Sequence, residues 1–155
     1  MKKALVLIVV TLLCAGGAVM ADTASEIRQL IIEENEQLRK TLKGQTDNYS
    51  EEGALEFWSS GGLMHEVTSA ARPDEYEMFT IRPKHIEVIT LVEGKAAVAM
   101  YYSEGAMKPK SSPSVSHYMT RATQVFVKEN GKWKTRAAHW SPIQGGGGTS
   151  QTALD

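Results

Sequence analysis

The stretch NGKWKTRAAHWSPI, residues 130–143, is the part of the sequence that decides the fold. It opens with Asn130 and Gly131, the strongest short signal for a two-residue β-hairpin turn. The segment before this stretch is VSHYMTRATQVFVKE (115–129), and the stretch itself contains KWKTRAAHWSP (132–142). Both segments have the composition of long strands. We therefore expect a pair of long antiparallel strands at the carboxyl end of the domain.

The side chains of this hairpin that carry chemistry are Arg121, His139 and Trp140. If the strands pair without a bulge, His139 lies opposite Ala122 and Trp140 opposite Arg121, so that the indole and the guanidinium can stack. A bulged turn instead brings Arg121 and His139 onto one face, toward the helices, where they suit acid–base catalysis or the anchoring of a carboxylate. The sequence leaves both registers open.

Upstream of the strands, residues 25–44 (SEIRQLIIEENEQLRKTLKG) predict an amphipathic helix. Ser25 is the expected N-cap and Gly44 the expected stop, with acidic residues early and basic residues late. Glu34 projects near the middle of the apolar stripe. It either leans to the rim or pairs with a buried cation such as Arg121, or it enters a cavity in which burial raises its pKa.

Between this helix and the hairpin, the sequence predicts shorter elements. A short helix is expected at residues 51–62 (EEGALEFWSSGG), with Ser50 as its cap. After it the hydrophobic period changes, and strands are expected at residues 63–69, 76–83, 85–94 and 95–105. Helices followed by antiparallel strands predict an α+β fold, in which the helices pack on the concave face of a curved antiparallel sheet.

The first 21 residues have the pattern of a cleaved export signal. Two lysines precede an apolar run that is too short to span a bilayer, and Val19 and Ala21 occupy the positions that signal peptidase prefers. We expect cleavage after Ala21, a mature protein in the periplasm or outside the cell, and no stable membrane anchor. The domain is then residues 22–144, and residues 145–155 form a flexible glycine-rich tail.

The composition excludes several classes of function. Without Lys2 and Lys3 the 17 basic residues become 15, against 18 acidic ones, a formal charge of −3 with no basic cluster, so nucleic acid is not an expected partner. The single cysteine, Cys14, leaves with the leader, and no disulfide or thiolate chemistry is expected. The histidines stand singly, which argues against a metal site, and no phosphate or dinucleotide motif predicts a cofactor.

The hairpin also resembles a known family, through Gly131, Trp133, His139 and Ser141. It is similar to the last hairpin of the association domain of calcium/calmodulin-dependent kinase II, with Trp140 where that domain has an arginine. The order of elements resembles the nuclear transport factor two-like, or SnoaL-like, superfamily. This resemblance implies a cone-shaped α+β domain with a deep pocket between sheet and helices, frequently a homodimer. Its members include isomerases, cyclases, dehydratases and simple binding proteins, so the fold does not identify the function.

Three functions are compatible with these features. The first is an exported protein that binds a small organic molecule in the pocket, without a cofactor. The second is a cofactor-independent isomerase, cyclase or hydratase that uses Glu34 or His139 as base and Arg121 to hold developing negative charge. The third is a homodimerisation module without a ligand. The candidate ligand-binding residues are Glu34, Trp58, Tyr101, Tyr118, Arg121, His139 and Trp140.

Overall fold

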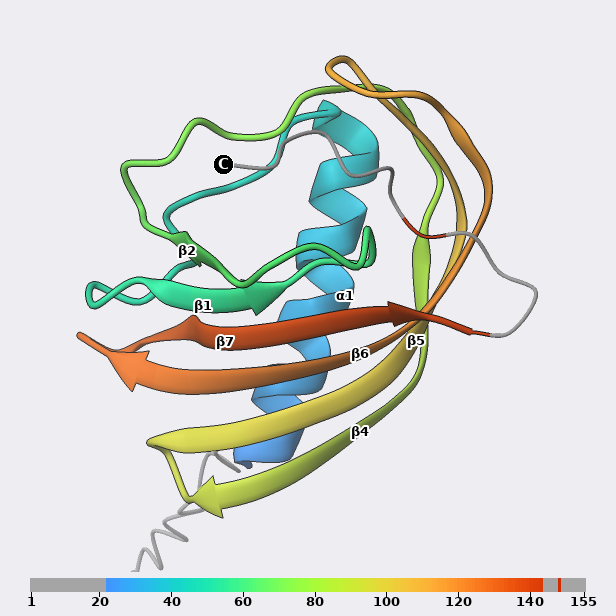
Figure 1. The fold of residues 1–155 in the computed structure, drawn as a ribbon. Helices are drawn as coiled ribbons and strands as arrows, with labels where there is room; N and C mark the ends of the chain where they lie inside the picture. The colour runs from blue at the N-terminus through green and yellow to red at the C-terminus, as the bar shows by residue number, and fades with distance from the viewer. Residues whose placement is uncertain (1–21, 144–147, 149–155) are drawn as a thin grey trace, which may run out of the picture.

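A computed structural model describes residues 22–143 and residue 148 of the chain. The expected leader, residues 1–21, and the expected tail apart from Gly148 lie outside the described residues. Within them the chain forms one helix followed by seven strands (Figure 1). That helix is not long and apolar enough to cross a membrane. The elements are α1 (Thr23–Thr41), β1 (Ala54–Phe57), β2 (His65–Val67), β3 (Tyr76–Phe79), β4 (Arg82–Val92), β5 (Ala96–Pro109), β6 (Val115–Glu129) and β7 (Lys132–Pro142).

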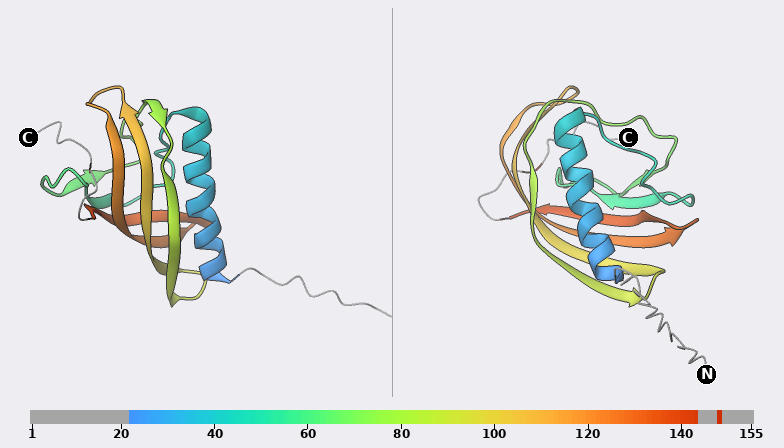
Figure 2. Two further views of the ribbon diagram at one scale, coloured as in Figure 1. Left: turned by 90° about the vertical axis from the view of Figure 1, so that its right-hand side faces the viewer. Right: turned by 180° about the vertical axis from the view of Figure 1, so that it is seen from behind.

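The strands form one curved sheet in the order β2-β1-β7-β6-β5-β3, with β4 also paired to β5. Neighbouring strands are antiparallel except β1 and β7, which are parallel, with Leu55 beside Ala137 and Phe57 beside His139. The sheet is therefore mixed, which corrects the expectation of a wholly antiparallel one. Figure 2 shows α1 lying along the concave side of the sheet. The architecture is α+β with a helix on a curved sheet, and in that respect the prediction is confirmed.

The short helix expected at residues 51–62 does not form. Its middle is strand β1, in which Ala54 and Glu56 are buried while Leu55 and Phe57 are exposed. Alternation with a period of two buries one face of a strand and exposes the other. A segment this short carries too few residues for its hydrophobic period to separate a strand from a helix, and here pairing with β7 decides.

The long helix forms as predicted, but both of its ends differ from the expected ones. Asp22 is the N-cap, and its carboxylate accepts a hydrogen bond of 2.7 Å from the backbone N–H of Ser25. Leu42 is the C-cap, in the left-handed conformation with φ of 56°, two residues before the expected stop at Gly44. Aspartate and serine are both good N-caps, so composition alone does not choose between them.

The core lies between the first half of α1 and the central strands. Ile27 and Ile31 are 0% and 1% exposed and pack against Ala97, Ala99 and Phe126. The two alanines of β5 present only methyl groups to the helix, so the backbones approach closely. This contact holds the first half of α1 on the sheet, and Glu34 follows immediately after it in the chain.

Asn130 and Gly131 form the two-residue turn predicted between β6 and β7, with φ angles of 49° and 77°. Positive φ at both positions is what a turn of this kind needs to match the twist of the strands. Glu129 and Lys132 face each other directly beside the turn, as expected.

A bulge further along the hairpin decides which side chains share a face. Arg136 is an extra residue in β7, and it shifts the register by one. His139 therefore lies opposite Thr123, and Arg121 lies opposite Ser141. Neither expected register is observed, because the turn is unbulged and the bulge lies inside the strands. Arg121 and His139 do share a face, but it is the convex face, away from α1.

Candidate functional site

A cavity of about 490 Å³ lies between α1, the β1–β2 pair and the concave side of the sheet. Its volume falls in the range of about 300–1,000 Å³ typical of small-molecule sites. The wall combines α1, the loop after it, β1, β2, the segment before β3 and the central strands β5 and β6. The pairing of β5 with β6 shifts between Gly105 and Met107, and irregular pairing of this kind lets a sheet curl around a space.

Glu34 of α1 lies at the wall of this cavity. Its Oε1 accepts a hydrogen bond of 3.2 Å from Nδ2 of Asn48, and no basic side chain of the described residues lies within ion-pair distance. The pKa of the carboxyl is raised to about 7, mainly by burial; the bond from Asn48 opposes this shift and the charge of Asp47 adds to it. Glu34 can therefore hold or release a proton near neutral pH.

Glu56 of β1 is a second carboxyl of the wall, and only 3% of the residue is exposed. Its Oε2 accepts a hydrogen bond of 2.8 Å from Nε1 of Trp58, whereas Oε1 is buried without a well-formed hydrogen bond from any described residue. Burial raises the pKa of Glu56 to about 7. Trp58 opposes the shift, the negative charge of Asp74 adds to it, and the nearby Tyr49 hydroxyl opposes it slightly.

Tyrosine hydroxyls supply further polar atoms at the wall. Tyr101 and Tyr118 are each 7% exposed. The Tyr101 hydroxyl donates a hydrogen bond of 2.7 Å to Oε1 of Gln124, and the Tyr118 hydroxyl accepts one of 3.4 Å from Oγ of Ser59. Burial raises the pKa of Tyr101, so its hydroxyl stays protonated at neutral pH.

Aromatic faces complete the wall. Trp58 stacks on His65 with ring centroids 4.1 Å apart and an angle of 8° between the planes. Trp140 lines the cavity from β7, Tyr49 from the loop after α1 and Tyr76 from the start of β3. Burial raises the pKa of both tyrosines, so these hydroxyls are also neutral. The cavity therefore combines apolar ring surface with a few buried polar groups, the usual make-up of a small-molecule site.

The structure brings together five of the seven residues predicted to bind a ligand: Glu34, Trp58, Tyr101, Tyr118 and Trp140. Arg121 and His139 lie elsewhere, on the exposed convex face of the sheet. Nε of Arg121 donates a hydrogen bond of 2.9 Å to Oγ of Ser141, and the His139 ring meets Phe57 edge-on at 5.6 Å. The expected acid–base set of Glu34, His139 and Arg121 is therefore not assembled. The bulge in β7 turns His139 outward, and Arg121 faces outward because β6 buries Ala122 and Gln124 on its opposite face.

Sequence reasoning missed Glu56, Tyr49 and Asp74, which all line the cavity. Glu56 was assigned to a helix; only as a strand residue does it share the inward face with the buried Ala54. That alternation is the one local signal that could have identified it. Tyr49 and Asp74 lie in connecting segments without a periodic pattern, so nothing local predicts where their side chains point.

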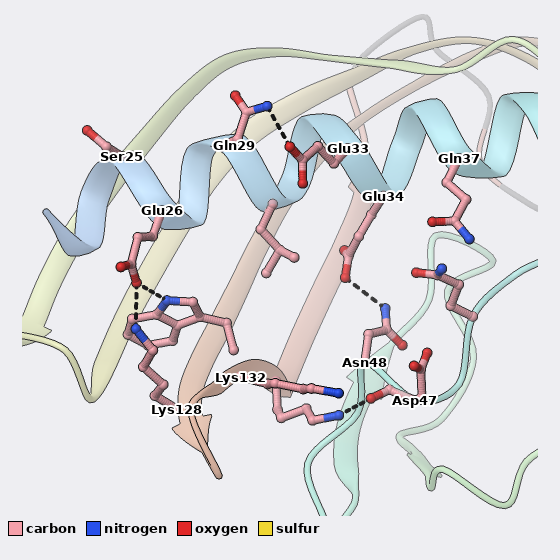
Figure 3. A pocket seen from close by; sticks show the side chains of 15 residues that line it. Ser25, Glu26, Gln29, Glu33, Glu34, Gln37, Asp47, Asn48, Lys128 and Lys132 are labelled. Carbon is pink, nitrogen blue, oxygen red and sulfur yellow. Dashed lines mark hydrogen bonds and ion pairs between the residues drawn. The ribbon is translucent and has the colours of Figure 1, made fainter. Parts of the chain in front are cut away.

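A groove of about 770 Å³ lies between the first half of α1 and the β6–β7 turn (Figure 3). Here Oε2 of Glu26 accepts hydrogen bonds of 2.7 Å from Nζ of Lys128 and 2.6 Å from Nε1 of Trp133. Glu34 and Asn48 border both the groove and the cavity. Among the residues that the structure describes, no three acidic, cysteine or histidine side chains are placed to hold a metal ion.

Two solved structures are similar to this chain, and the first of them supports this architecture. A nuclear transport factor two-like protein of unknown function from Pseudomonas putida has a TM-score of 0.53 at 21% sequence identity, covering 85% of this chain and 95% of that one. The association domain of calcium/calmodulin-dependent kinase II from C. elegans has a TM-score of 0.47 at 12% identity, over 75% of this chain and 90% of that one. No family model and no curated protein matches the sequence. The chain has the nuclear transport factor two-like fold.

Proposed function

We propose that this protein binds a small, partly apolar organic molecule in the cavity under α1. The observation that carries the proposal is the convergence of buried and half-buried polar groups on this space, above all the Glu34 and Glu56 carboxyls. Buried polar atoms are normally hydrogen-bonded, and Oε1 of Glu56 lacks such a partner in the described part of the chain. A ligand that donates a hydrogen bond to Oε1 of Glu56 would explain why a carboxyl lies in the buried wall of the cavity.

The three tryptophans of the chain provide a direct test. Trp58 and Trp140 line the cavity, whereas Trp133 lines the groove beyond Glu34. In isotope-labelled protein, a naphthyl probe that enters the cavity is expected to shift the indole N–H resonances of Trp58 and Trp140 and to leave that of Trp133 in place. If naphthyl probes of every charge leave the cavity indoles unmoved, or shift all three equally, the proposal is wrong.

A variant with a narrower cavity makes this test sharper. Ser103 lines the cavity and is 6% exposed, so Ser103→Phe places a ring in the space and should weaken binding of the probe. The matched control is Ser116→Phe, an exposed position at the start of β6 that does not line the cavity. Circular dichroism shows whether each variant is folded. Equal binding to a folded Ser103→Phe and to the wild type would place the probe elsewhere.

We also propose that the domain is exported after removal of residues 1–21. The leader pattern supports this, and cleavage after Ala21 leaves Asp22 in place to cap α1. The intact mass of protein made in a bacterium with its native leader should show Asp22 as the first residue. Recovery of the full-length chain from the cytoplasm would contradict export.

The convex face of the sheet supports a further proposal, a homodimer formed by packing two such faces. Apolar residues at neighbouring paired positions form a row across β4, β5, β6, β7 and β1: Ile89, Val98, Val125, Ala137 and Leu55. Beside this convex row, Met100 is 50% and Phe57 46% exposed. Soluble monomers rarely expose a contiguous apolar surface across so many strands.

The size and chemistry of the convex row fit a second copy of the same chain. The strands lie about 4.8 Å apart; β4, β5, β6 and β7 have 11 to 15 residues and β1 has four, so the five present a face of up to about 20 by 40 Å. That area is comparable with the roughly 800 Å² per partner of a standard stable interface. Near a twofold axis each residue meets its own copy, so an uncharged row suits self-pairing.

Sedimentation equilibrium tests the dimer. The wild type is expected at twice the mass of one chain, and Val125→Lys, at the centre of the convex row, should be a monomer because it buries like charges against each other. Ser116→Lys, at an exposed position at the start of the same strand and outside the convex row, should stay dimeric. A wild type that remains monomeric at high concentration would exclude this assembly.

A further inference from the structure

The wall of the cavity has a surplus of hydrogen-bond acceptors. The Glu34 carboxyl receives one long bond, of 3.2 Å, from Asn48. Oε1 of Glu56 and Oδ1 of Asn48 are buried, and no described residue donates a well-formed hydrogen bond to either, although the Tyr49 hydroxyl lies near the Glu56 carboxyl. All three residues line the cavity, from α1, from the loop after it and from β1. Unpaired buried acceptors are costly, at about 1–3 kcal/mol each, so a ligand that satisfies them gains affinity.

Several donors of the same wall are already used by the protein itself. Nε1 of Trp58 donates to Glu56 at 2.8 Å, and the Tyr101 hydroxyl donates to Gln124 at 2.7 Å. One N–H of the Asn48 amide donates to Glu34. A ligand that brings donors therefore finds open acceptors at Glu34, Glu56 and Asn48.

The charges of the wall favour the same kind of ligand. Glu34 and Glu56 lie inside, and the charge of Asp74 acts unfavourably on that of Glu56. The basic side chains of the wall, Lys43 and Arg72, are exposed at its edge and form no ion pair with these carboxyls among the described contacts. A positive group inside the cavity would relieve this repulsion and favour the ionised carboxylates.

The rest of the wall fits an organic cation better than a bare metal ion. Trp58, Tyr101, Tyr118 and Trp140 offer ring surface, which attracts organic cations through cation–π contacts and buries their apolar parts. The acceptor oxygens come from separate elements, and no three ligating side chains of the described chain gather into a metal site. The wall therefore has hydrogen-bond acceptors, negative charge and aromatic rings around one space.

From this juxtaposition we infer that the ligand is an organic cation, a protonated amine whose N–H groups donate to Glu34, Glu56 and Asn48 and whose apolar part lies against the aromatic wall. The inference rests on the proposed function, because it names the class of molecule that occupies the cavity. It does not depend on the homodimer or on export.

Three probes with the same ring and different charge test the inference: naphthylmethylamine, naphthylmethanol and naphthoate. Each is titrated into the whole mature chain at about pH 8, where carboxyls of this kind are ionised, with the indole N–H resonances of Trp58 and Trp140 as the readout. The amine is expected to bind about tenfold or more tightly than the alcohol, since charge-assisted hydrogen bonds are the stronger ones. Naphthoate is expected to bind most weakly.

Two variants identify the carboxyls that select the charge. Glu34→Gln and Glu56→Gln keep the shape of the side chain and remove its charge, so each should weaken binding of the amine about tenfold and leave the alcohol within about threefold. Binding of the alcohol also reports that each variant keeps a folded cavity. Glu36→Gln is the matched control, an exposed carboxyl on the same helix that does not line the cavity.

The outcomes separate the two claims. If the alcohol or naphthoate moves the cavity indoles at concentrations as low as the amine does, the cation inference is overturned and the proposed binding function stands. The same holds if both glutamine variants bind the amine as tightly as the wild type. If none of the three probes moves the cavity indoles of the wild type, the binding function fails, and this inference fails with it.

Discussion

Glu26 and Glu34 lie about two turns apart on α1, and both point toward the groove between the helix and the β6–β7 turn (Figure 3). Glu26 meets Lys128 and Trp133, and these hydrogen bonds lower its pKa. Glu34 meets only Asn48 at its boundary with the cavity, and burial raises its pKa to about 7. The same side chain on one helix thus stabilises the fold at one position and stays open to a ligand at the other. The two positions differ because Glu26 faces β6 and β7, whereas Glu34 faces Asn48 in the loop after α1.

Glu56, the most enclosed of the unpaired carboxyls, is expected to show the largest effect. Its pKa is raised from 4.5 to about 7, so its contribution to stability is full below pH 4.5, is lost as the pH rises through about 7, and stays lost above it. The complete loss corresponds to at most about 3 kcal/mol. Glu56→Gln should therefore be more stable relative to wild type at pH 8 than at pH 4.5, by up to about 3 kcal/mol.

Urea unfolding of wild type and Glu56→Gln at both pH values measures this difference directly. Comparing the two proteins at each pH cancels the titration of all other groups, provided that the urea dependence of the unfolding free energy is the same in both. A gap between the two proteins that does not change with pH would show that Glu56 is not protonated preferentially in the folded state.

Glu34→Gln should change stability with the same sign but less, about 1–2 kcal/mol between acid and alkaline conditions. The carboxyl borders two hollows and keeps a hydrogen bond from Asn48, so water and a partner already offset part of its burial. Nuclear magnetic resonance titration of the side-chain carboxyl carbon provides an independent check. A midpoint near 4.5, the ordinary value, would remove the contrast with Glu26.

Glu26→Gln should have the opposite sign, a loss of about 1 kcal/mol at neutral pH. Its pKa is lowered, so the stability it contributes is present above 4.5 and is lost as the pH falls through the folded value. A double-mutant cycle with Lys128→Met isolates the ion pair of 2.7 Å. If Glu26→Gln is as stable as wild type at neutral pH, the bonds that Lys128 and Trp133 make to Glu26 do not stabilise the packing of the helix on the sheet.

Glu36→Gln should have the smallest effect, within about 0.5 kcal/mol at any pH. This carboxyl is 48% exposed, and its only ion pair in the described chain is a distance of 3.8 Å to Arg39. It is the baseline for the other three substitutions, because it removes a charge from the same helix without touching the cavity or the groove. Its unfolding curve in urea should overlay that of the wild type.

Much of the fold could be predicted because its signals are local. The helix carries an apolar stripe through Ile27 and Ile31, and the Asn130-Gly131 turn sets the last hairpin. Strand β1 could not be predicted, because Ala54–Phe57 is too short for its period to be read and is held by pairing with β7, a strand distant in sequence.

The candidate site could be predicted only in part, for a related reason. Glu34 can be identified because a carboxylate within the apolar stripe of a helix is visible in the sequence. Glu56 lies in a strand too short to show a hydrophobic pattern around it. The two carboxyls come from separate elements and line one cavity only because the sheet curls under the helix. Arg121 and His139 were expected in the pocket, but the extra residue at Arg136 turns His139 outward, and the alternation of β6 places Arg121 on the same outer face. A one-residue shift reverses which face every later side chain occupies.

By itself the sequence determined the approximate limits of α1 and the turn between β6 and β7, since caps, periodicity and turn residues act over a few positions. Only the tertiary structure decided that Glu26 has a cationic partner, Lys128, and that Glu34 and Glu56 have none among the described residues. The pKa of a carboxyl depends on burial and on the groups within a few ångströms, and most of these neighbours come from other elements and loops of the folded chain. The chemistry of the cavity is therefore a property of the assembled sheet and helix.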